Sequence, residues 1–506
     1  MRYFSILIIT ITLLFSACRK DFSAELSSGV LSFSKDTVYL DTVFTNIGSS
    51  TYLLKVYNKN NKNISIPNIS LGRGESSFYR LNVDGTPGKT FENIEISAKD
   101  SIYIFIETTI NYNNVTNPIY TDSIVFSGGG HLQDVKLVTL VKDANFLFPQ
   151  KDLNGVIETI TIGIDDDGEK INVNGFYLDG NTTFTNEKPY VIYGYCGVAS
   201  NNTLTVDPGA SIYFHSNSGL IVDKNATLLI NGELNNEVTI GGDRLEPEYS
   251  NTPGQWGTIW LRAGSKNHYI NHALIKNAST GITIDSISSN SAPTLTIKNT
   301  QIYNSSNFGI LAKETNIEGK NLVINNSGKS SLACTIGGTY NFTHSTFVNY
   351  WINSLRQYPS VVINNYFSNT ENNQITLEPR DLLAANFTNC IIDGNNNIEL
   401  IIDQVDGSVF NYLFKNNMIK FIDYSNSYAN IPTYNFEDTN HYLNNIFNGN
   451  PDFKSPSENE FIIGQDSEGI EKADLQGTTN VPIDILGVIR TKPADIGAYQ
   501  HIIFEE

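Results

Sequence analysis

Short runs of alternating apolar and polar residues, separated by clusters of turn residues, fill the chain from position 28 to position 143. Ser101–Ile106 is one such run, and a period of two is the pattern of a half-buried β-strand. About seven such runs in roughly 115 residues, without a helical period, are typical of an immunoglobulin-like sandwich. We therefore predict a β-sandwich over residues 28–143. Residues 144–190 are predicted to be a connecting segment and the entry to a solenoid, which is described next.

A different pattern follows, in which one short phrase recurs: an apolar residue, one spacer and an asparagine. The copies are Ile275–Asn277, Ile302–Asn304, Ile324–Asn326, Phe347–Asn349, Phe367–Asn369 and Phe414–Asn416. Their asparagines are 27, 22, 23, 20 and 47 residues apart, and the last step is interpreted as two steps with a degenerate copy at Ile392–Gly394. A period of about 22 residues filled with short β-rich runs is typical of a β-solenoid. We predict this solenoid over residues 191–450 and a capping region over residues 451–506.

Asparagine tolerates the left-handed backbone conformation and hydrogen-bonds its neighbours, so it suits a corner that recurs in every coil. We predict a stacked corner ladder of Asn277, Asn304, Asn326, Asn349 and Asn369. The context Asn341–His344 recurs as Asn386–Asn389, 45 residues later. His344 is therefore interpreted as a hydrogen-bonding corner residue in preference to a catalytic one.

The start of the solenoid contains the clearest internal repeat. Leu204–Phe214 is matched at a step of 16 residues by Leu220–Ile230, which predicts that the two segments occupy equivalent positions in successive coils. Farther on, Trp256 and Trp260 share one face of a strand under strict alternation. Core packing is the preferred interpretation for both, and stacking of an exposed indole on a sugar is the alternative.

Composition supports an almost all-β protein. The 506 residues include 26 tyrosines and 27 phenylalanines, which favour strands, but only 2 methionines. The formal net charge of −19 makes nucleic acid an unsuitable partner, since an acidic surface repels phosphate backbones. Beyond the leader, the three cysteines have wide spacing and no metal-binding pattern, and they are interpreted as small apolar fillers of the interior. We expect a monomer without a cofactor, apart from calcium as discussed below.

The first residues have the features of a targeting segment. Met1-Arg2 is a basic start, the stretch from Tyr3 to Phe15 is apolar and too short to span a bilayer, and small residues precede Cys18. This resembles a bacterial lipoprotein signal, with residues 1–17 removed, Cys18 acylated and residues 18–27 as a tether. An ordinary cleaved secretory leader is the alternative. Arg19-Lys20-Asp21 partly resembles the tag that sends lipoproteins of the Bacteroidetes to the surface of the outer membrane, so we expect a cell-envelope protein anchored by lipid.

Three further resemblances concern the fold. The motifs Leu31–Phe33, Thr42–Phe44, Ile47-Gly48, Val56–Asn58 and Ile64–Ile66 are similar in order to the hydin-like immunoglobulin folds, which serve in adhesion or as spacers. The segment from Leu204 to Gly257 resembles the first coils of right-handed parallel β-helix proteins of bacterial surfaces, the pectin lyase-like fold. The phrases around Asp484–Arg490 and Asp495–Tyr499 resemble the closing motif of choice-of-anchor Q proteins. Together these predict an all-β chain with an N-terminal sandwich and a right-handed parallel β-helix. We expect a structural cap to close the β-helix. Asp484, Arg490 and Asp495 would belong to this cap, with a bond between Arg490 and Asp495.

An acidic cluster lies in the connecting segment. Asp165, Asp167 and Glu169 offer carboxylate oxygens to a calcium ion. The cluster lacks the alternating spacing of an EF-hand loop, and an Asp-Gly turn between two strands is the simpler interpretation.

The solenoid contains charged residues but no recognisable catalytic motif. The candidates are Lys276, Lys298, His344, Arg356, Arg380, Asp393, Asp403 and Asp406. We therefore predict a non-enzymatic glycan-binding or adhesion protein that holds a polysaccharide on exposed aromatic residues, namely Tyr303, Tyr350, Trp351, Tyr358 and Tyr366. A polysaccharide lyase-like or glycoside hydrolase-like enzyme is the alternative, and it would gather acids and cations on one flank of consecutive coils. A structural spacer is the third possibility.

Overall fold

The computed structural model describes residues 24–27, 31–115, 117–128, 130–165, 167–285, 292–371 and 374–504. The chain divides into two compact units, and the division falls between Asp143 and Ala144. Among the described residues, no helix is long and apolar enough to cross a membrane. Cys18 lies outside the described residues.

The first unit is a β-sandwich of two sheets. One sheet contains β1 (Glu25–Leu26), β3 (Thr37–Phe44), β5 (Ile64–Leu71), β8 (Thr90–Ile96), β10 (Ile119–Gly128) and β11 (His131–Lys142). The other contains β2 (Ser32–Phe33), β4 (Tyr52–Tyr57), β6 (Tyr79–Val83), β7 (Thr86–Gly88) and β9 (Ser101–Thr108). Alternation in β9 decides its orientation, because Ile102, Ile104 and Ile106 are buried between the sheets while Tyr103 and Phe105 are exposed.

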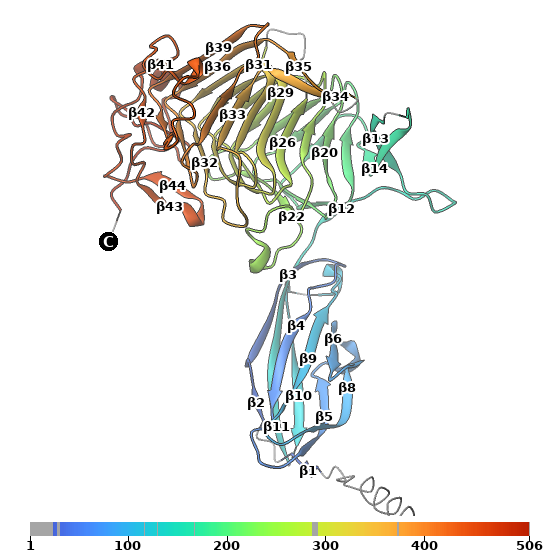
Figure 1. Cartoon of the computed structure of the whole chain (residues 1–506). Coiled ribbons are helices and arrows are strands. Elements are labelled where there is room, and N and C mark those ends of the chain that lie inside the picture. The colour runs from blue at the N-terminus through green and yellow to red at the C-terminus, as the bar shows by residue number, and fades with distance from the viewer. Residues whose placement is uncertain are drawn as a thin grey trace, which may run out of the picture. The chain divides into compact units, whose positions relative to one another are not determined.

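The second unit is a parallel β-helix whose coils have three sides (Figure 1). Side 1 consists of β14 (Lys170–Tyr177), β17 (Tyr195–Val198), β20 (Gly219–Val222), β23 (Ile259–Leu261), β26 (Thr280–Asp285), β33 (Val361–Asn364) and β38 (Leu400–Asp403). Side 2 consists of β15 (Thr182–Phe184), β18 (Thr203–Val206), β21 (Thr227–Asn231), β24 (His268–Asn271), β27 (Leu295–Lys298), β36 (Leu382–Thr388), β39 (Phe410–Lys415) and β41 (Tyr442–Leu443). The long strands β29 (Phe308–Lys320) and β31 (Leu332–Thr343) belong to both sides. From β14 to β26 each strand pairs with the strand three places along, and later coils have other offsets because long strands span two sides or extra loops are present.

Side 3 is a separate sheet of 11 strands. They are β12 (Asn145–Leu147), β16 (Tyr190–Ile192), β19 (Ser211–Phe214), β22 (Val238–Gly242), β25 (Ala273–Lys276), β28 (Gln301–Ser305), β30 (Val323–Ser327), β32 (Thr346–Asn349), β37 (Ile391–Gly394), β40 (Met418–Ile419) and β42 (Ile446–Phe447). Inward side chains from all three sides form one continuous core, because stacked coils bury equivalent apolar positions against each other. The predicted all-β fold, a sandwich followed by a parallel β-helix, is confirmed.

The remaining elements are hairpins and short helices. The hairpin strands are β13 (Thr159–Ile164), which pairs with β14, β34 (Tyr366–Glu371) with β35 (Gln374–Pro379), and β43 (Phe453–Ser455) with β44 (Glu460–Ile463). The one α-helix in the described residues is α2 (Leu475–Asn480). The 3-10 turns are η1 (Gly74–Ser76), η2 (Tyr112–Asn114), η3 (Pro247–Tyr249), η4 (Pro432–Tyr434) and η5 (Pro456–Glu458).

The repeat at a step of 16 residues does not correspond to successive coils, so that prediction is wrong. Leu204 pairs with Leu228, and Leu220 pairs with Cys196. Leu204 is on side 2 and Leu220 is on side 1, so the two copies of the strand-turn-strand motif form different corners of the stack. The same local chemistry serves both corners, since Ala210 and Ala226 each close a turn on the carbonyl of the aspartate three residues before.

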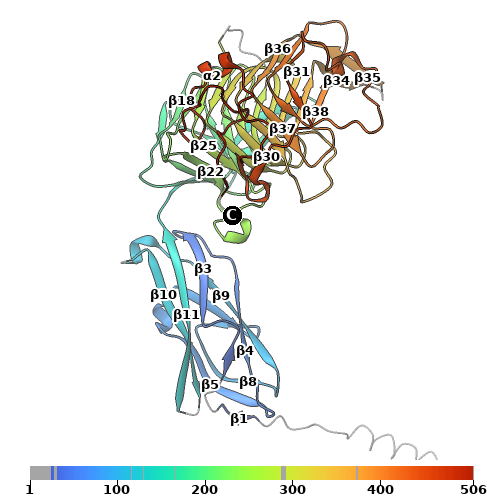
Figure 2. The same cartoon turned by 90° about the vertical axis from the view of Figure 1, so that its left-hand side faces the viewer.

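The steps of 20 and 47 residues also have a different origin, because the copy at Ile392–Gly394 follows Phe347–Asn349 directly in register, 45 residues on. Phe347 pairs directly with Ile392, which makes one long coil in place of two short ones. The extra length includes the antiparallel hairpin β34–β35, which projects from the stack (Figure 2). Phe367 and Asn369 belong to this hairpin, so they are not a copy of the repeat. Phe414 pairs with Phe387 on side 2, so that copy belongs to another side of the coil.

The segment after residue 450 packs against the outer surface of side 3 and does not close the end of the stack, so the predicted end cap is wrong. Apolar side chains of side 3 point outward, away from the solenoid core, and the C-terminal segment buries them. The outward residues are Tyr303, Val323, Val348, Ile391 and Met418, and the covering residues include Phe461, Ile463, Ile485, Ile496 and Tyr499. Strands that are apolar on both faces require a cover on each face, which is the physical reason for this arrangement.

The three residues assigned to the cap hold this covering segment together. Arg490 is buried and donates from Nη2 to Asn321 Oδ1 at 2.8 Å and to the carbonyl of Gly497 at 3.1 Å, so its hydrogen bonds differ from the predicted bond to Asp495. Asp495 instead accepts from the amides of Glu471 and His501. Asp484 accepts three backbone amides, those of Leu486, Val488 and Gln500.

Candidate functional site

The outer surface of side 1 carries a row of charged residues from four consecutive coils. Strand pairing aligns Asp223, Arg262, Asp285 and Lys313, because the buried residues before the first three, Val222, Leu261 and Ile284, pair in turn and Asp285 pairs directly with Lys313. Alternation sends these polar side chains outward while the residues before them point into the core. We call these four residues the charged row.

Ion pairs join the members of the charged row. Arg262 Nη1 lies 2.9 Å from Asp223 Oδ1, and Lys313 Nζ lies 3.0 Å from Asp285 Oδ1. Arg262 also donates to the carbonyl of Thr161 at 3.2 Å, which ties the β13–β14 hairpin to this surface. Side chains on this surface are partly exposed, so each pair is accessible to a ligand.

Two aromatic residues are hydrogen-bonded to the acids of the row. Tyr177 donates its hydroxyl to Asp223 Oδ2 at 2.8 Å, and Trp260 donates its indole N–H to Asp285 Oδ2. Burial, followed by the hydrogen bond to Asp223, raises the pKa of Tyr177 to about 12. The Arg262 guanidinium lies 5.6 Å from the ring centre of Trp260. Both rings are therefore held in fixed orientations while remaining partly exposed.

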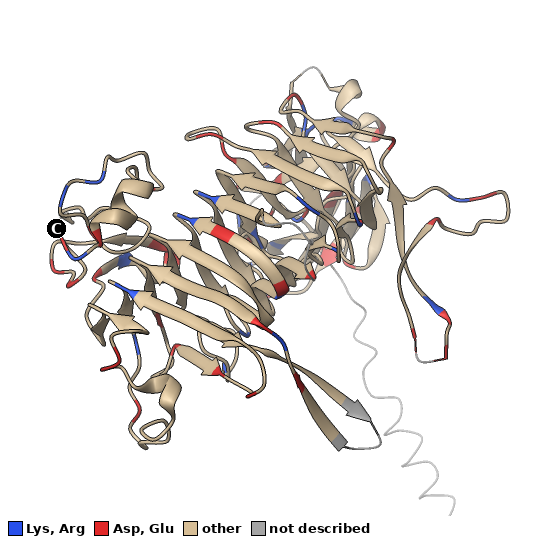
Figure 3. Ribbon diagram, turned by 90° about the horizontal axis from the view of Figure 1, so that it is seen from above, with Lys and Arg blue, Asp and Glu red and all other residues tan. Residues whose placement is uncertain are grey.

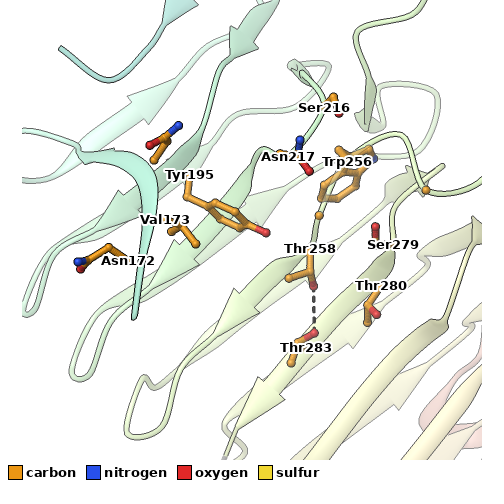
Figure 4. A pocket seen from close by; sticks show the side chains of 13 residues that line it. Asn172, Val173, Tyr195, Ser216, Asn217, Trp256, Thr258, Ser279, Thr280 and Thr283 are labelled. Atoms are coloured by element: carbon orange, nitrogen blue, oxygen red, sulfur yellow. Dashed lines mark hydrogen bonds between the residues drawn. The ribbon is translucent and has the colours of Figure 1, made fainter. Parts of the chain in front are cut away.

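A hollow of about 590 Å³ lies beside the charged row (Figure 4). We call it the neutral hollow. It is lined by Asn172, Val173, Asn174, Tyr195, Ser216, Asn217, Gly254, Trp256, Gly257, Thr258, Ser279, Thr280 and Thr283. None of these residues carries a carboxylate, an ammonium or a guanidinium group. Hydroxyl and amide groups from five successive coils therefore dominate its polar surface.

Tyr195 forms part of the lining of the neutral hollow because neighbouring coils have glycine where a side chain would collide with its ring. A Cβ added at Gly257 would lie 2.3 Å from the Tyr195 hydroxyl, and one added at Gly219 would lie 2.7 Å from its ring. In Figure 4 the hydroxyl points toward Thr258, whose Oγ1 lies 3.1 Å from Thr283 Oγ1. Burial raises the pKa of Tyr195, so its hydroxyl stays protonated and can donate at neutral pH.

Thr283 connects the neutral hollow with the aromatic residues, because it pairs with Trp260 in the preceding coil. The arrangement offers a ligand a set of hydroxyl donors and acceptors next to a partly exposed indole. Most of the strand surface in Figure 3 is uncharged, and charged residues gather at turns and strand ends. The charged row is therefore a local feature of side 1.

Three of the five aromatic residues predicted to bind a glycan are not available for it. Tyr303 is buried under the C-terminal segment, Tyr350 packs against Phe461 with ring centres 6.0 Å apart, and Trp351 is 8% exposed. Tyr358 is exposed in the loop after β32. Tyr366 begins the β34–β35 hairpin and donates its hydroxyl to Asp403. The structure thus does not bring the five residues together on one surface.

The predicted asparagine ladder is present in its first three members. Asn304 donates to Asn277 Oδ1 at 3.1 Å, Asn326 donates to Asn304 Oδ1 at 2.7 Å, and all three have positive φ. Asn349 follows in register but binds the backbone of Ser327. Asn369 lies in the hairpin, so its assignment to the ladder is wrong.

A second ladder runs along the corner between sides 2 and 3. Its members are His272, Asn299, Asn321, His344, Asn389 and Asn416, and all have positive φ. Asn389 Nδ2 lies 2.9 Å from His344 Nε2, so the prediction of a hydrogen-bonded corner histidine is confirmed. Burial keeps the pKa of His344 well below its usual value, so the ring is neutral.

The acidic cluster forms the turn of the β13–β14 hairpin. Asp165 Oδ1 accepts the backbone amides of Asp167 and Glu169, at 3.1 and 2.8 Å, as an Asp-Gly turn requires. No group of three or more metal-ligating side chains occurs among the described residues. Calcium binding at Asp165, Asp167 and Glu169 stays a prediction.

Other candidate residues have structural surroundings. Cys196, Cys334 and Cys390 are buried, and burial raises the pKa of each thiol. Arg356 forms a buried ion pair with Glu399, and Asp393 lies 3.7 Å from Lys420. Trp256 is buried against Phe214 as expected, whereas Trp260 lies on the outer surface, so the preferred interpretation of both indoles as core residues is wrong for Trp260.

Sequence reasoning missed the charged row and the neutral hollow. Asp223, Arg262, Asp285 and Lys313 occur one per coil, and each follows a buried apolar residue of an alternating run. A charged residue at the same position of the alternation in each coil was the signal in the sequence. It could be used only with the correct coil lengths, which vary with the loops between strands.

No protein-family model matches the chain, and no curated protein sequence matches it. Several solved structures align with it at low similarity. The catalytic unit of a thermostable GH87 α-1,3-glucanase from Streptomyces thermodiastaticus aligns over 72% of this chain and 74% of its own, with 11% identity and a TM-score of 0.21. A family 123 glycoside hydrolase from Clostridium perfringens aligns over 24% of this chain and 30% of its own, with 10% identity and a TM-score of 0.18. The periplasmic chaperone SfaE aligns over 22% of this chain and 58% of its own, with 11% identity and a TM-score of 0.17. At these values the comparisons assign no activity to this chain.

Proposed function

We propose that this protein is a lipid-anchored protein of the cell envelope whose solenoid binds an extended polysaccharide along the outer surface of side 1. The observation that carries the proposal is the neutral hollow, which is continuous through Thr283 with the indole of Trp260. A sugar ring has an apolar face that stacks on an aromatic ring and hydroxyl edges that bind amides and hydroxyls. The neutral hollow and Trp260 supply both kinds of contact side by side.

Binding without catalysis is the function that this geometry supports best. The lining of the neutral hollow contains no carboxylate that would act as a general acid or base. The acids next to it, Asp223 and Asp285, each already accept hydrogen bonds from a cation and an aromatic residue. A ligand in the neutral hollow therefore meets neutral donors and acceptors first.

The experiment measures retention of the soluble form, residues 19–506, on immobilised plant and algal polysaccharides. We expect at least tenfold weaker binding for Trp260→Ala, and weaker binding for Tyr195→Phe and Thr283→Val. Tyr424→Ala is the matched control, because Tyr424 is 79% exposed and does not line the neutral hollow. Retention that is equal in all four variants and the wild type would exclude side 1 as the binding surface.

A second candidate function follows from the charged row. Acids and cations from four consecutive coils gather on one flank, which is the arrangement expected of a polysaccharide lyase or glycoside hydrolase. The same polysaccharides should be assayed for unsaturated products by absorbance and for new reducing ends. Product formation that Asp285→Asn abolishes, with retention unchanged, would replace the binding proposal by the enzymatic one.

A further inference from the structure

A second hollow, of about 430 Å³, lies between the end of side 2 and the C-terminal segment. We call it the basic hollow. Its polar lining includes His272, Lys298 and Lys320, and its apolar lining comes from Leu234 and from the segment Val481 to Ile483. Its residues differ from those of the neutral hollow, so it is a separate site that does not depend on the function proposed above.

Two lysines occupy neighbouring positions at this site. Lys298 and Lys320 pair directly in adjacent parallel strands, which places their side chains on the same outer surface about 4.8 Å apart at the backbone. Like charges at directly paired positions repel each other. Lys320 is partly neutralised by Glu318 at 2.6 Å, but Lys298 forms no ion pair with a described carboxylate. Its ammonium lies only over the ring of Tyr269, at 5.7 Å.

The acidic group in the lining does not offset these charges. Asp484 is buried, and its two oxygens accept three backbone amides within its own segment. Behind it lies Arg490, which reaches the lining through its bond to Asn321. Arg490 Nε and Nη1 are buried without a hydrogen-bond partner among the described residues. Asp484 and Asp495 offset the charge of Arg490, and Glu318 offsets that of Lys320. Lys298 therefore remains as the cation of this lining that has no ion pair with a described carboxylate.

We propose that the basic hollow binds a sugar acid, with its carboxylate between Lys298 and Lys320 and one face of its ring against Val481, Pro482 and Ile483. The carboxylate relieves the repulsion between the two ammonium groups. The ring face covers the apolar wall, and the volume fits a ligand of one or two sugar rings. His272 stands at the edge of the site with Glu237 and Glu233 nearby, which favours a ligand whose negative charge lies at the lysine end.

The test uses glucuronic acid and glucose, which differ only at the carboxylate, in saturation-transfer NMR with the soluble form, residues 19–506. We expect binding of glucuronic acid and none of glucose at the same concentration. Lys298→Gln and Lys320→Gln should each weaken binding at least tenfold. Lys35→Gln is the matched control, because it changes the net charge equally but lies in the sandwich unit.

Four outcomes would overturn the proposal. One is equal signals from glucuronic acid and glucose, and another is wild-type binding by both lysine variants with folding verified by tryptophan fluorescence. The third is displacement of glucuronic acid by an equal concentration of sodium sulfate, which would show a site for any anion. Trp260→Ala should leave glucuronic acid binding unchanged, and loss of binding in that variant would place the ligand at the neutral hollow instead. Failure of polysaccharide retention on side 1 has no bearing on these measurements.

Discussion

Arg356 and Glu399 form an ion pair that is shut off from solvent, with side chains 2% and 0% exposed. Glu399 also accepts the amides of Ser360 and Asn396, at 2.7 and 2.8 Å. Arg356 donates from Nη2 to the carbonyl of Asn349 at 2.9 Å. The pair therefore fastens the loop after β32 to the turn before β38, where the chain makes its longest coil.

Removing one charge of this pair should destabilise the solenoid strongly. Glu399→Gln keeps the shape but leaves the guanidinium buried without a counter-charge, which costs about 3–5 kcal/mol of the free energy of unfolding. The double variant Arg356→Met/Glu399→Gln should lose less, because it removes the unpaired charge. Urea unfolding followed by tryptophan fluorescence measures this unit alone, since Trp256, Trp260 and Trp351 all lie in it. A double variant less stable than Glu399→Gln would contradict the prediction.

Asn304 is the middle member of the first ladder, and its role separates into two parts. Its side-chain amide donates to Asn277 and accepts from Asn326. Its backbone is in the left-handed conformation, with a φ of 59°. Asn304→Gly keeps the backbone conformation and loses only the hydrogen bonds, at about 1–3 kcal/mol. Asn304→Leu should lower the free energy of unfolding by about a further 1–2 kcal/mol, because a leucine side chain is strained at this φ. Equal stabilities of the two variants in urea unfolding would show that backbone strain is unimportant here.

His268 should make the solenoid less stable in acid. Its Nδ1 accepts the amide of Leu228, and burial lowers its pKa from 6.5 to about 3. Between these pH values the unfolded chain binds a proton at this residue and the folded chain does not. The free energy of unfolding therefore falls as the pH falls, by about 1.4 kcal/mol per pH unit from this group.

The matched variant for this effect is His268→Gln, whose side-chain oxygen can accept the same amide. Its free energy of unfolding should change less between pH 6.5 and pH 4.5 than that of the wild type, when both are measured by urea unfolding. Parallel pH profiles would show that His268 is protonated in the folded protein. His344, whose pKa burial also lowers, contributes in the same direction in both proteins.

Cys18 should carry lipid, since a single cysteine follows small residues after a short apolar run. Acyl chains give a membrane attachment that an acidic protein does not otherwise have. Mass spectrometry of the mature N-terminus detects the modification. Cys18→Ser should move the protein from the membrane fraction to the soluble fraction, and an unchanged distribution would refute lipid anchoring.

The local patterns of the sequence were sufficient for the fold class and for part of the corner chemistry. Alternation in Ser101–Thr108 predicts a sandwich strand, and the recurrence of asparagine at positions 277, 304 and 326 predicts a ladder. These features depend on the backbone preferences and the alternation of residues that are close together in the sequence, so the sequence is enough to predict them.

Only the tertiary structure decided which segments stack and which surfaces remain free. The sequence shows that Leu204 and Leu220 begin similar motifs, but lateral pairing places them on different sides of the coil. Tyr303 is in a strand as expected, yet the C-terminal segment covers it. Asp223, Arg262, Asp285 and Lys313 meet because coils of unequal length bring them into register. Pairing and burial depend on contacts between residues far apart in the chain, and the length of a loop changes those contacts without changing the pattern of the strands that it joins.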